Sequence, residues 1–249
     1  MENIFITNIR VHKVNNLTNF DILLSSSERK HLILTGANGI GKTRLLEALR
    51  DNMISAQQEA ASKEEEASQL FEEYPKSGNS LSLSYSNDIS RLPDVPVLYF
   101  PASRQALIAP KRAEGSSFEN LSLLDFMLSI SDKGEDLYGQ CFLGLQGFLR
   151  EIYDVPKLEL MLHNYVFHIC VPGKKPLAIH QISDCYASLL NIYMTIALRS
   201  VLLTGTVRHE LPAIVLVDEV EAHLHFSLQR RILSILTSTF PGIQFIVTT

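Results

Sequence analysis

Apolar residues alternate with polar ones at the start of the chain and then change period. Residues 4–11 and 22–24 predict two strands, separated by a turn at Asn15-Asn16. The apolar run 31–35 predicts a short buried strand that leads directly into a glycine. From there residues 43–53 place leucines and a methionine at helical spacing, which predicts an amphipathic helix.

The middle of the chain mixes polar, helical and alternating segments. Residues 55–80 are rich in Glu, Ser, Gln and Ala, which predicts a solvated helix or mobile insertion, with a partner-binding arm as the alternative. A strand is expected at 95–100, followed by a mainly helical block over 105–153. Residues 157–183 alternate again, and the Pro-Gly-Lys-Lys at 172–175 predicts a hairpin turn.

The last third predicts a long helix and then a strand, a helix and a strand. The helix covers 184–203, and the following elements are expected at 213–217, 225–238 and 243–248. Because strands alternate with helices at both ends of the chain, we expect a largely parallel sheet with covering helices. We interpret residues 1–249 as one domain, which is near the upper size for a single core.

Composition changes this picture little. The net charge of −5 gives no overall attraction to nucleic acid or anionic membrane, so DNA binding would need a local basic patch. Cys141, Cys170 and Cys185 have no metal-like spacing, which favours buried thiols in a reducing cytoplasm. The apolar stretch 185–203 is interrupted by two polar residues, and the first residues lack a signal-peptide pattern. We therefore expect no membrane association.

A phosphate-binding loop is the most specific motif. Residues 36–43 match G-x-x-x-x-G-K-[ST] (Walker A) in full, between a predicted strand and a predicted helix, and chance yields this pattern in on the order of 1% of chains of this length. Glycines let the backbone wrap phosphates, and the helix N-terminus points free N–H groups at them. Lys42 should neutralise the β and γ oxygens, and the Thr43 hydroxyl should bind Mg²⁺. The expected nucleotide-binding residues are Gly36, Ala37, Asn38, Gly39, Ile40, Gly41, Lys42, Thr43 and Arg44.

Two carboxylates close an apolar strand later in the chain, as in a Walker B motif. Asp218 and Glu219 follow the run 214–217, and ligands sit at the carboxyl ends of buried parallel strands. Asp218 would hold Mg²⁺ with Thr43, and Glu219 would polarise the attacking water. An Asp-Glu pair is also a common loop start, but with the phosphate loop it predicts ATP and Mg²⁺ as cofactors and an ATPase.

Three stretches resemble the ABC-type ATPase heads of the SMC, RecF and OLD (overcoming lysogenization defect) group. They are Gly-Ala-Asn-Gly-Ile-Gly-Lys-Thr-Arg-Leu-Leu-Glu-Ala-Leu (36–49), Ile-Ser-Asp-Cys-Tyr-Ala-Ser-Leu-Leu (182–190) and Asp-Glu-Val-Glu-Ala-His-Leu-His (218–225). Within that group the chain is similar to bacterial AAA-family ATP-binding proteins of the virulence or phage-defence type. The resemblance implies an α/β fold: a P-loop NTPase with ABC-ATPase-head architecture, a largely parallel sheet, N-terminal antiparallel strands and a helical lobe.

The resemblance also implies a mechanism in two halves. Such heads form ATP-dependent homodimers, in which the signature residues Ser183, Asp184 and Cys185 would act on the partner's ATP. It implies an effector protein, a nuclease or toxin from the same operon, or action on DNA in defence or repair. Cys185 stands where the group has glycine, and Phe226 where it has proline. Gln105 is a candidate Q-loop residue that would sense Mg²⁺, and the sequence favours this role and its absence equally.

Other readings of these residues stay open. A nucleotide-gated scaffold with little turnover is the main functional alternative. A transporter subunit fits less well, because such subunits carry Leu-Ser-Gly-Gly-Gln and a proline where this chain has Val220. His223 and His225 near the carboxylates suggest a metal site, but they lack the i, i+4 spacing of zinc motifs.

The end of the chain carries one further expectation. In the group that the sequence resembles, the strand at 243–249 runs into a histidine that contacts the γ-phosphate, and no residue follows Thr249 here. We therefore expect a truncated chain that binds nucleotide and hydrolyses it poorly.

Overall fold

The fold is that of a computed structural model, which describes residues 4–64, 79–86, 95–102, 135–164, 166–222 and 224–249. The chain divides into two compact units. The sheet unit comprises residues 1–102, 210–220 and 242–249, and the helical unit comprises 103–209 and 221–241. In chain order the elements are β1 (Ile6–Val14), β2 (Leu17–Leu23), β3 (Leu32–Leu34), α1 (Lys42–Glu64), β4 (Ser80–Tyr85), β5 (Val97–Phe100), α3 (Glu135–Tyr153), β6 (Glu159–His163), β7 (Val166–Cys170), β8 (Leu177–Ala178), the 3₁₀ helix η2 (Ile179–Gln181), α4 (Asp184–Thr204), β9 (Ala213–Val217), α5 (Phe226–Gln229), α6 (Ile232–Thr239) and β10 (Ile243–Thr248).

The expected N-terminal strands form an antiparallel sheet. Its order is β2-β1-β4, and the turn between β1 and β2 contains Asn15 in the left-handed region, at φ +52°. The third strand, β4, was not predicted. Its sequence Ser-Leu-Ser-Leu-Ser-Tyr alternates strictly, and every second side chain faces the core. The polar stretch 55–80 therefore divides: α1 continues to Glu64, β4 begins at Ser80, and residues 65–78 lie outside the described part of the chain.

The second sheet of this unit is parallel, as the strand and helix pattern predicted. Its order is β3-β10-β9-β5, and all three pairings are parallel. All residues of β9 and β10 are buried, which explains their nearly continuous apolar sequences. The strand order places β10 between the strand that enters the phosphate loop and the strand that ends at Asp218.

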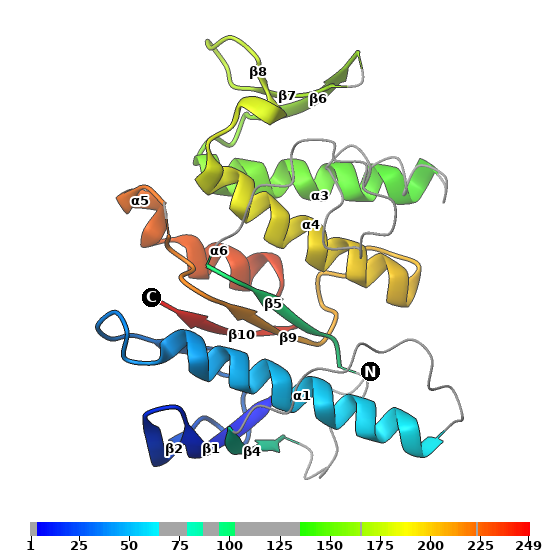
Figure 1. The fold of residues 1–249 in the computed structure, drawn as a ribbon. Helices are drawn as coiled ribbons and strands as arrows, with labels where there is room; N and C mark the ends of the chain where they lie inside the picture. The colour runs from blue at the N-terminus through cyan, green and yellow to red at the C-terminus, as the bar shows by residue number, and fades with distance from the viewer. Residues whose placement is uncertain (1–3, 65–78, 87–94, 103–134, 165, 223) are drawn as a thin grey trace. The chain divides into compact units, whose positions relative to one another are not determined.

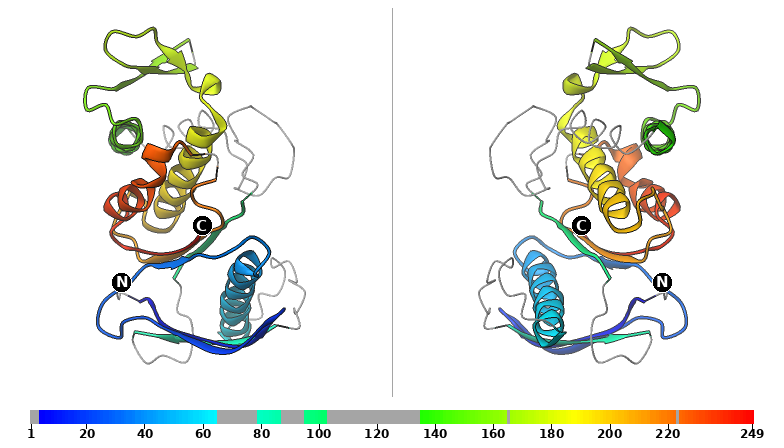
Figure 2. Two further views of the ribbon diagram at one scale, coloured as in Figure 1. Left: turned by 90° about the vertical axis from the view of Figure 1, so that its left-hand side faces the viewer. Right: turned by 90° about the vertical axis from the view of Figure 1, so that its right-hand side faces the viewer.

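Helix α1 packs between the two sheets of the sheet unit (Figure 1; the left view of Figure 2 looks almost along the helix). Its apolar face contributes Leu45, Leu46, Leu49 and Met53 to a core shared with β1, β9 and β10. One buried polar side chain joins the sheets: Gln244 of β10 bonds both to β1 and to the loop before β3. The predicted apolar helix face is thus confirmed.

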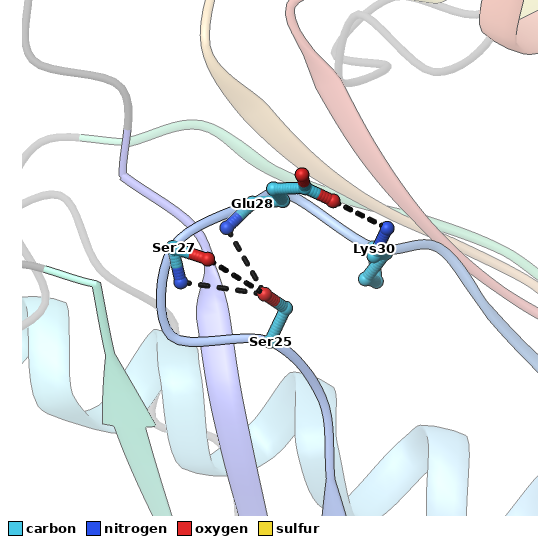
Figure 3. Close-up of polar contacts among 4 residues, drawn as sticks. All are labelled: Ser25, Ser27, Glu28 and Lys30. Carbon is cyan, nitrogen blue, oxygen red and sulfur yellow. Dashed lines mark hydrogen bonds and ion pairs between the residues drawn. The ribbon is translucent and has the colours of Figure 1, made fainter.

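A short loop leads from β2 into β3 and fixes where the phosphate-loop strand begins. The Ser25 hydroxyl accepts the N–H groups of Ser27 at 3.3 Å and Glu28 at 3.1 Å, which forms a serine turn (Figure 3). Lys30 forms an ion pair with Glu28 at 2.5 Å across the same loop. These are exposed contacts, so they order the loop more than they stabilise the fold.

The helical unit is built around α3, α4 and α6 (Figure 1). Phe148 of α3 stacks on Tyr193 of α4 with ring centroids 4.8 Å apart, and Tyr193 in turn meets Phe240 at 5.6 Å. By length and composition α4 could cross a membrane, but 61% of its most apolar window is buried inside the structure. That burial is what a core helix shows.

Two segments of this unit differ in detail from the sequence pattern. The alternating region forms a three-stranded antiparallel sheet, β6-β7-β8, with the expected turn at 172–175 between β7 and β8. The helix expected at 225–238 is broken into α5 and α6. At the break Arg231 pairs with Asp154 at 3.1 Å and donates to the Glu151 carbonyl, so tertiary contacts accompany the interruption.

Candidate functional site

The phosphate loop has the backbone that its glycines allow. It connects the end of β3 to the first residue of α1. Gly39 and Gly41 have φ values of +81° and +110°, which other residues rarely adopt. A Cβ at Gly41 would also lie 3.4 Å from the Leu17 side chain. The loop therefore depends on glycine for its turn, while the space beside Gly41 would admit a Cβ in ordinary contact with Leu17.

The positive end of α1 and a lysine ammonium gather at this loop. Lys42 donates from Nζ to the carbonyl oxygens of Gly36 at 2.5 Å and Ala37 at 3.3 Å, so its charge lies over the loop. The first N–H groups of α1 lack intrahelical partners and form an anion site. Arg44 forms an i,i+3 ion pair with Glu47 at 2.8 Å on the helix surface.

The acidic strand end meets the phosphate loop directly. Asp218 follows β9 and is 2% exposed. Its Oδ2 accepts a hydrogen bond from the Thr43 hydroxyl at 2.9 Å, although the two residues are 175 positions apart. Because the Thr43 hydroxyl donates its hydrogen to Asp218, the lone pairs of the hydroxyl oxygen are available to a cation. Hydroxyl and carboxylate oxygens are the donors that Mg²⁺ prefers, so this pair fits the predicted metal.

Glu219 occupies an unusual turn after Asp218. Its φ of +46° is in the left-handed region, and its N–H donates to the Thr248 hydroxyl at 2.7 Å. The same hydroxyl donates to Asp218 Oδ1 at 2.6 Å. The sequence pattern did not single out Thr248. The available signal was a polar residue that closes a mostly apolar strand, at the same sheet edge as the carboxylates.

Tyr99 and Arg50 are also close to the acidic strand end, and neither was predicted. The guanidinium carbon of Arg50 lies 4.8 Å from the centre of the Tyr99 ring. Burial, and then the nearby carboxylates of Asp218 and Glu47, raise the pKa of Tyr99 to about 12. Tyr99 therefore stays protonated and neutral beside the carboxylates across the physiological range.

The signature residues lie at the beginning of α4, in the helical unit. Ser183 is the N-cap residue, and its Oγ lies 3.0 Å from the Cys185 Sγ. Asp184 is the first helical residue and is exposed, as is Ser183. The sequence had predicted a helix N-terminus here. The structure places the motif there, with the serine hydroxyl in contact with the cysteine that replaces glycine.

Several expected residues are not part of the described site. Gln105 and His223 lie outside the described residues. His225 is exposed at the N-cap of α5, where its Nδ1 is 3.3 Å from the Ser227 hydroxyl. Among the residues that the structure describes, no group of three or more His, Cys, Asp and Glu side chains could hold a metal ion.

A protein-family model matches most of this chain. Residues 56–249 match the family model AAA_21, described as "AAA domain, putative AbiEii toxin, Type IV TA system". The match begins after the phosphate loop, so the loop is supported by its own sequence and backbone.

Curated relatives and solved structures match as well. "Septu protein PtuA" of Bacillus mycoides (strain KBAB4) is 23% identical over 98% of this chain and 38% of its own length. "Retron Vc95 probable ATPase" of Vibrio cholerae serotype O1 biovar El Tor is 29% identical over 39% of this chain and 20% of its own. This chain thus spans well under half of either relative.

The fold itself has solved counterparts. The SMC head bound to the C-terminal winged-helix domain of ScpA is 15% identical and covers 98% of this chain and 89% of that chain, with a TM-score of 0.51. The fold class is therefore that of an SMC-head-like P-loop ATPase, as the resemblance implied. The family match, the relatives and the fold agree with the SMC/RecF/OLD-like group, and this chain belongs to the AAA_21 family of AAA domains.

Proposed function

We propose that this chain binds ATP with Mg²⁺ and hydrolyses it as a dimerising switch of the SMC/RecF/OLD-like type. The contact between Thr43 and Asp218 carries the proposal. It joins the two motifs that the sequence predicted independently, and it does so through the oxygen atoms that a magnesium site needs. The family and the names of the relatives support an ATPase of the Septu and retron defence type.

Each residue has a distinct part in binding and hydrolysis. The phosphate loop wraps the phosphates with its backbone N–H groups, and Lys42 neutralises charge on the β and γ oxygens. Thr43 and Asp218 hold Mg²⁺, which when bound neutralises negative charge that develops on the phosphates. Glu219 orients the attacking water beside them, as the carboxylate next to the metal-binding aspartate.

The second half of the proposal concerns assembly. Ser183 and the first turn of α4 provide an exposed helix N-terminus, which suits a phosphate of a second copy's ATP. An ATP-dependent homodimer would then transmit the nucleotide state to an effector protein, a nuclease or toxin from the same operon, or to DNA, in cytoplasmic phage defence or repair. The net charge of the chain is −5, so contact with DNA would require a local basic surface.

The alternative is a nucleotide-gated scaffold with little turnover. One contact favours it: the Ser183 hydroxyl lies 3.0 Å from the Cys185 thiol, so the signature serine has a competing partner. Under this alternative ATP would assemble the dimer, but phosphate release would stay near background. Cys185→Gly, which restores the residue of the related group, would then raise turnover.

Glu219→Gln tests the switch. The amide keeps the size of the side chain but removes the carboxylate that orients water, so ATP-bound dimers should accumulate. Light scattering with Mg²⁺·ATP measures the mass, and Lys42→Ala/Glu219→Gln is the matched control that should stay monomeric. If Glu219→Gln binds ATP but remains monomeric at high protein concentration, the assembly half of the proposal is wrong.

A further inference from the structure

Thr248 has more contacts with the site than its place in the chain suggests. It is the last residue of β10 and is fully buried. Its hydroxyl donates to Asp218 Oδ1 at 2.6 Å and accepts the Glu219 N–H at 2.7 Å. Its carbonyl oxygen accepts the Val220 N–H at 3.0 Å. Thr248 therefore bonds Asp218, Glu219 and Val220, three consecutive residues that we call the acidic turn.

The number of hydrogens on the Thr248 hydroxyl determines which of its two hydrogen bonds it donates and which it accepts. A threonine hydroxyl has one hydrogen to donate. The Glu219 N–H must donate, so the threonine oxygen accepts there and its own hydrogen goes to the Asp218 carboxylate. Asp218 is thus held by two hydroxyls, with Thr43 donating to Oδ2 and Thr248 to Oδ1. Each carboxylate oxygen accepts a hydrogen bond from a different threonine, which leaves the group little freedom to rotate.

The backbone of the next residue depends on the same hydroxyl. Glu219 has φ +46°, a conformation that a residue with a Cβ adopts rarely and keeps only where its surroundings impose it. The bonds from Glu219 N–H and Val220 N–H to Thr248 flank that residue on both sides. They hold the backbone of Glu219 in this conformation and so fix the direction in which its side chain leaves the turn.

The end of β10 is fixed in turn by the strand that enters the phosphate loop. The N–H of Thr249 donates to the Leu34 carbonyl at 3.0 Å, two residues before the loop begins. Since β10 lies between β3 and β9, its last residues touch both halves of the site. Thr248 is therefore placed to keep the acidic turn in register with the phosphate loop.

We propose that Thr248 is a positioning residue for Mg²⁺-dependent ATP binding and hydrolysis: its hydroxyl orients Asp218 toward the metal and sets the backbone of Glu219. This inference rests on the proposed function of the site. It predicts that loss of the hydroxyl affects steps that need Mg²⁺ and leaves Mg²⁺-free nucleotide binding unchanged, because the phosphate loop does not contact this hydroxyl.

The test compares Thr248→Val, which keeps the shape and loses the hydroxyl, with Thr248→Ser, which keeps the hydroxyl. The probe is a ribose-labelled fluorescent ATP, followed by its anisotropy in EDTA and across a Mg²⁺ titration. Groups that orient metal ligands typically contribute about 10–100-fold to metal affinity or activity. For Thr248→Val we expect the half-saturating Mg²⁺ concentration to rise about tenfold or more and kcat to fall by about 10–100-fold, with affinity in EDTA unchanged. Thr248→Ser should stay within about threefold of the unaltered chain in both, since its hydroxyl reaches the same partners.

Controls separate this inference from folding and from the proposed function. Thr237→Val removes a hydroxyl on α6 that bonds only locally to Ser234, and it should change nothing. If Thr248→Val does not fold, Thr248→Cys supplies a similar shape with a weak donor and should shift the Mg²⁺ dependence in the same direction. An unaltered Mg²⁺ titration and kcat in folded Thr248→Val would overturn the inference. Lys42→Ala in the same assay tests the proposed function separately. If Lys42→Ala abolishes nucleotide binding, the proposed function stands whatever Thr248→Val shows. If Lys42→Ala binds nucleotide normally, the proposed function itself fails.

Discussion

Replacing Gln244 with leucine tests how the two sheets of the sheet unit are joined. The buried amide accepts the Ile6 N–H at 2.7 Å and donates to the carbonyl oxygens of Ile6 at 3.0 Å and Lys30 at 2.8 Å. Leucine leaves both buried groups of Ile6 without these partners, at about 1–3 kcal/mol each. Lys30 is exposed, so water can replace the third bond. Leucine recovers about 1–2 kcal/mol through its apolar surface. We expect a net loss of about 1–4 kcal/mol in the free energy of unfolding.

Chemical unfolding followed by far-UV circular dichroism measures this loss, since the chain has no tryptophan. In thermal unfolding the same loss corresponds to roughly 2–16 °C for a chain of this size. Hydrogen exchange should also accelerate in β1, which leucine no longer connects to β10. The matched control is Gln229→Leu, because Gln229 is exposed and makes one bond, to the Leu224 carbonyl at 2.9 Å. Equal, small effects of the two substitutions would refute the reasoning.

Two further predictions concern packing and pH. Gly147→Ala should stabilise α3 by about 0.5–1 kcal/mol, because a Cβ there meets nothing within 4 Å, whereas a Cβ at Gly144 would lie 2.5 Å from the buried Tyr193 hydroxyl and should cost about 1–3 kcal/mol. Thermal unfolding should shift in opposite directions for the two variants, and equal shifts would contradict the packing described. His31 accepts the Phe245 N–H through Nδ1 at 3.1 Å, and burial, followed by a nearby arginine, lowers the pKa of His31. The unfolded chain therefore takes up the proton first as the pH falls below about 6.5, so stability is present above that pH and is lost down to the lowered pKa. His31→Asn keeps an acceptor that does not titrate, so the fall in unfolding free energy between about pH 7 and 5 should be shallower; an identical slope would rule His31 out as a contributor.

The features that could be predicted from the sequence are those that a local residue pattern determines. The phosphate loop is readable because glycines, lysine and threonine must stand at fixed spacing between a strand and a helix. The strand that ends at Asp218 is readable because a buried parallel strand is continuously apolar. Helices α1 and α4 follow from apolar spacing and length. In each case the signal and the structure lie in the same short segment.

Features that depend on distant segments could not be predicted in this way. Thr248 bonds residues some 30 positions away, and only the strand order β3-β10-β9-β5 brings it to the acidic turn. Tyr99 is near enough to Asp218 for the carboxylate to raise the pKa of Tyr99 for the same reason, because β5 pairs with β9. The break between α5 and α6 coincides with contacts of Arg231 to the end of α3. Strand β4 was missed for a different reason. Its alternating sequence was visible, but it follows a long polar stretch.

Nucleotide binding by Lys42→Ala is the most direct test of the central claim, that residues 36–43 and Asp218 form an ATP·Mg²⁺ site. The Lys42 ammonium lies over the loop that would hold the phosphates. A hydrogen bond to a charged group contributes about 1.5–3 kcal/mol, so affinity for the labelled ATP should fall about 10–100-fold. Lys30→Ala is the matched control, an exposed lysine paired with Glu28 in the loop before β3. The account predicts weak binding by folded Lys42→Ala and normal binding by Lys30→Ala. Normal binding by a folded Lys42→Ala protein would contradict it.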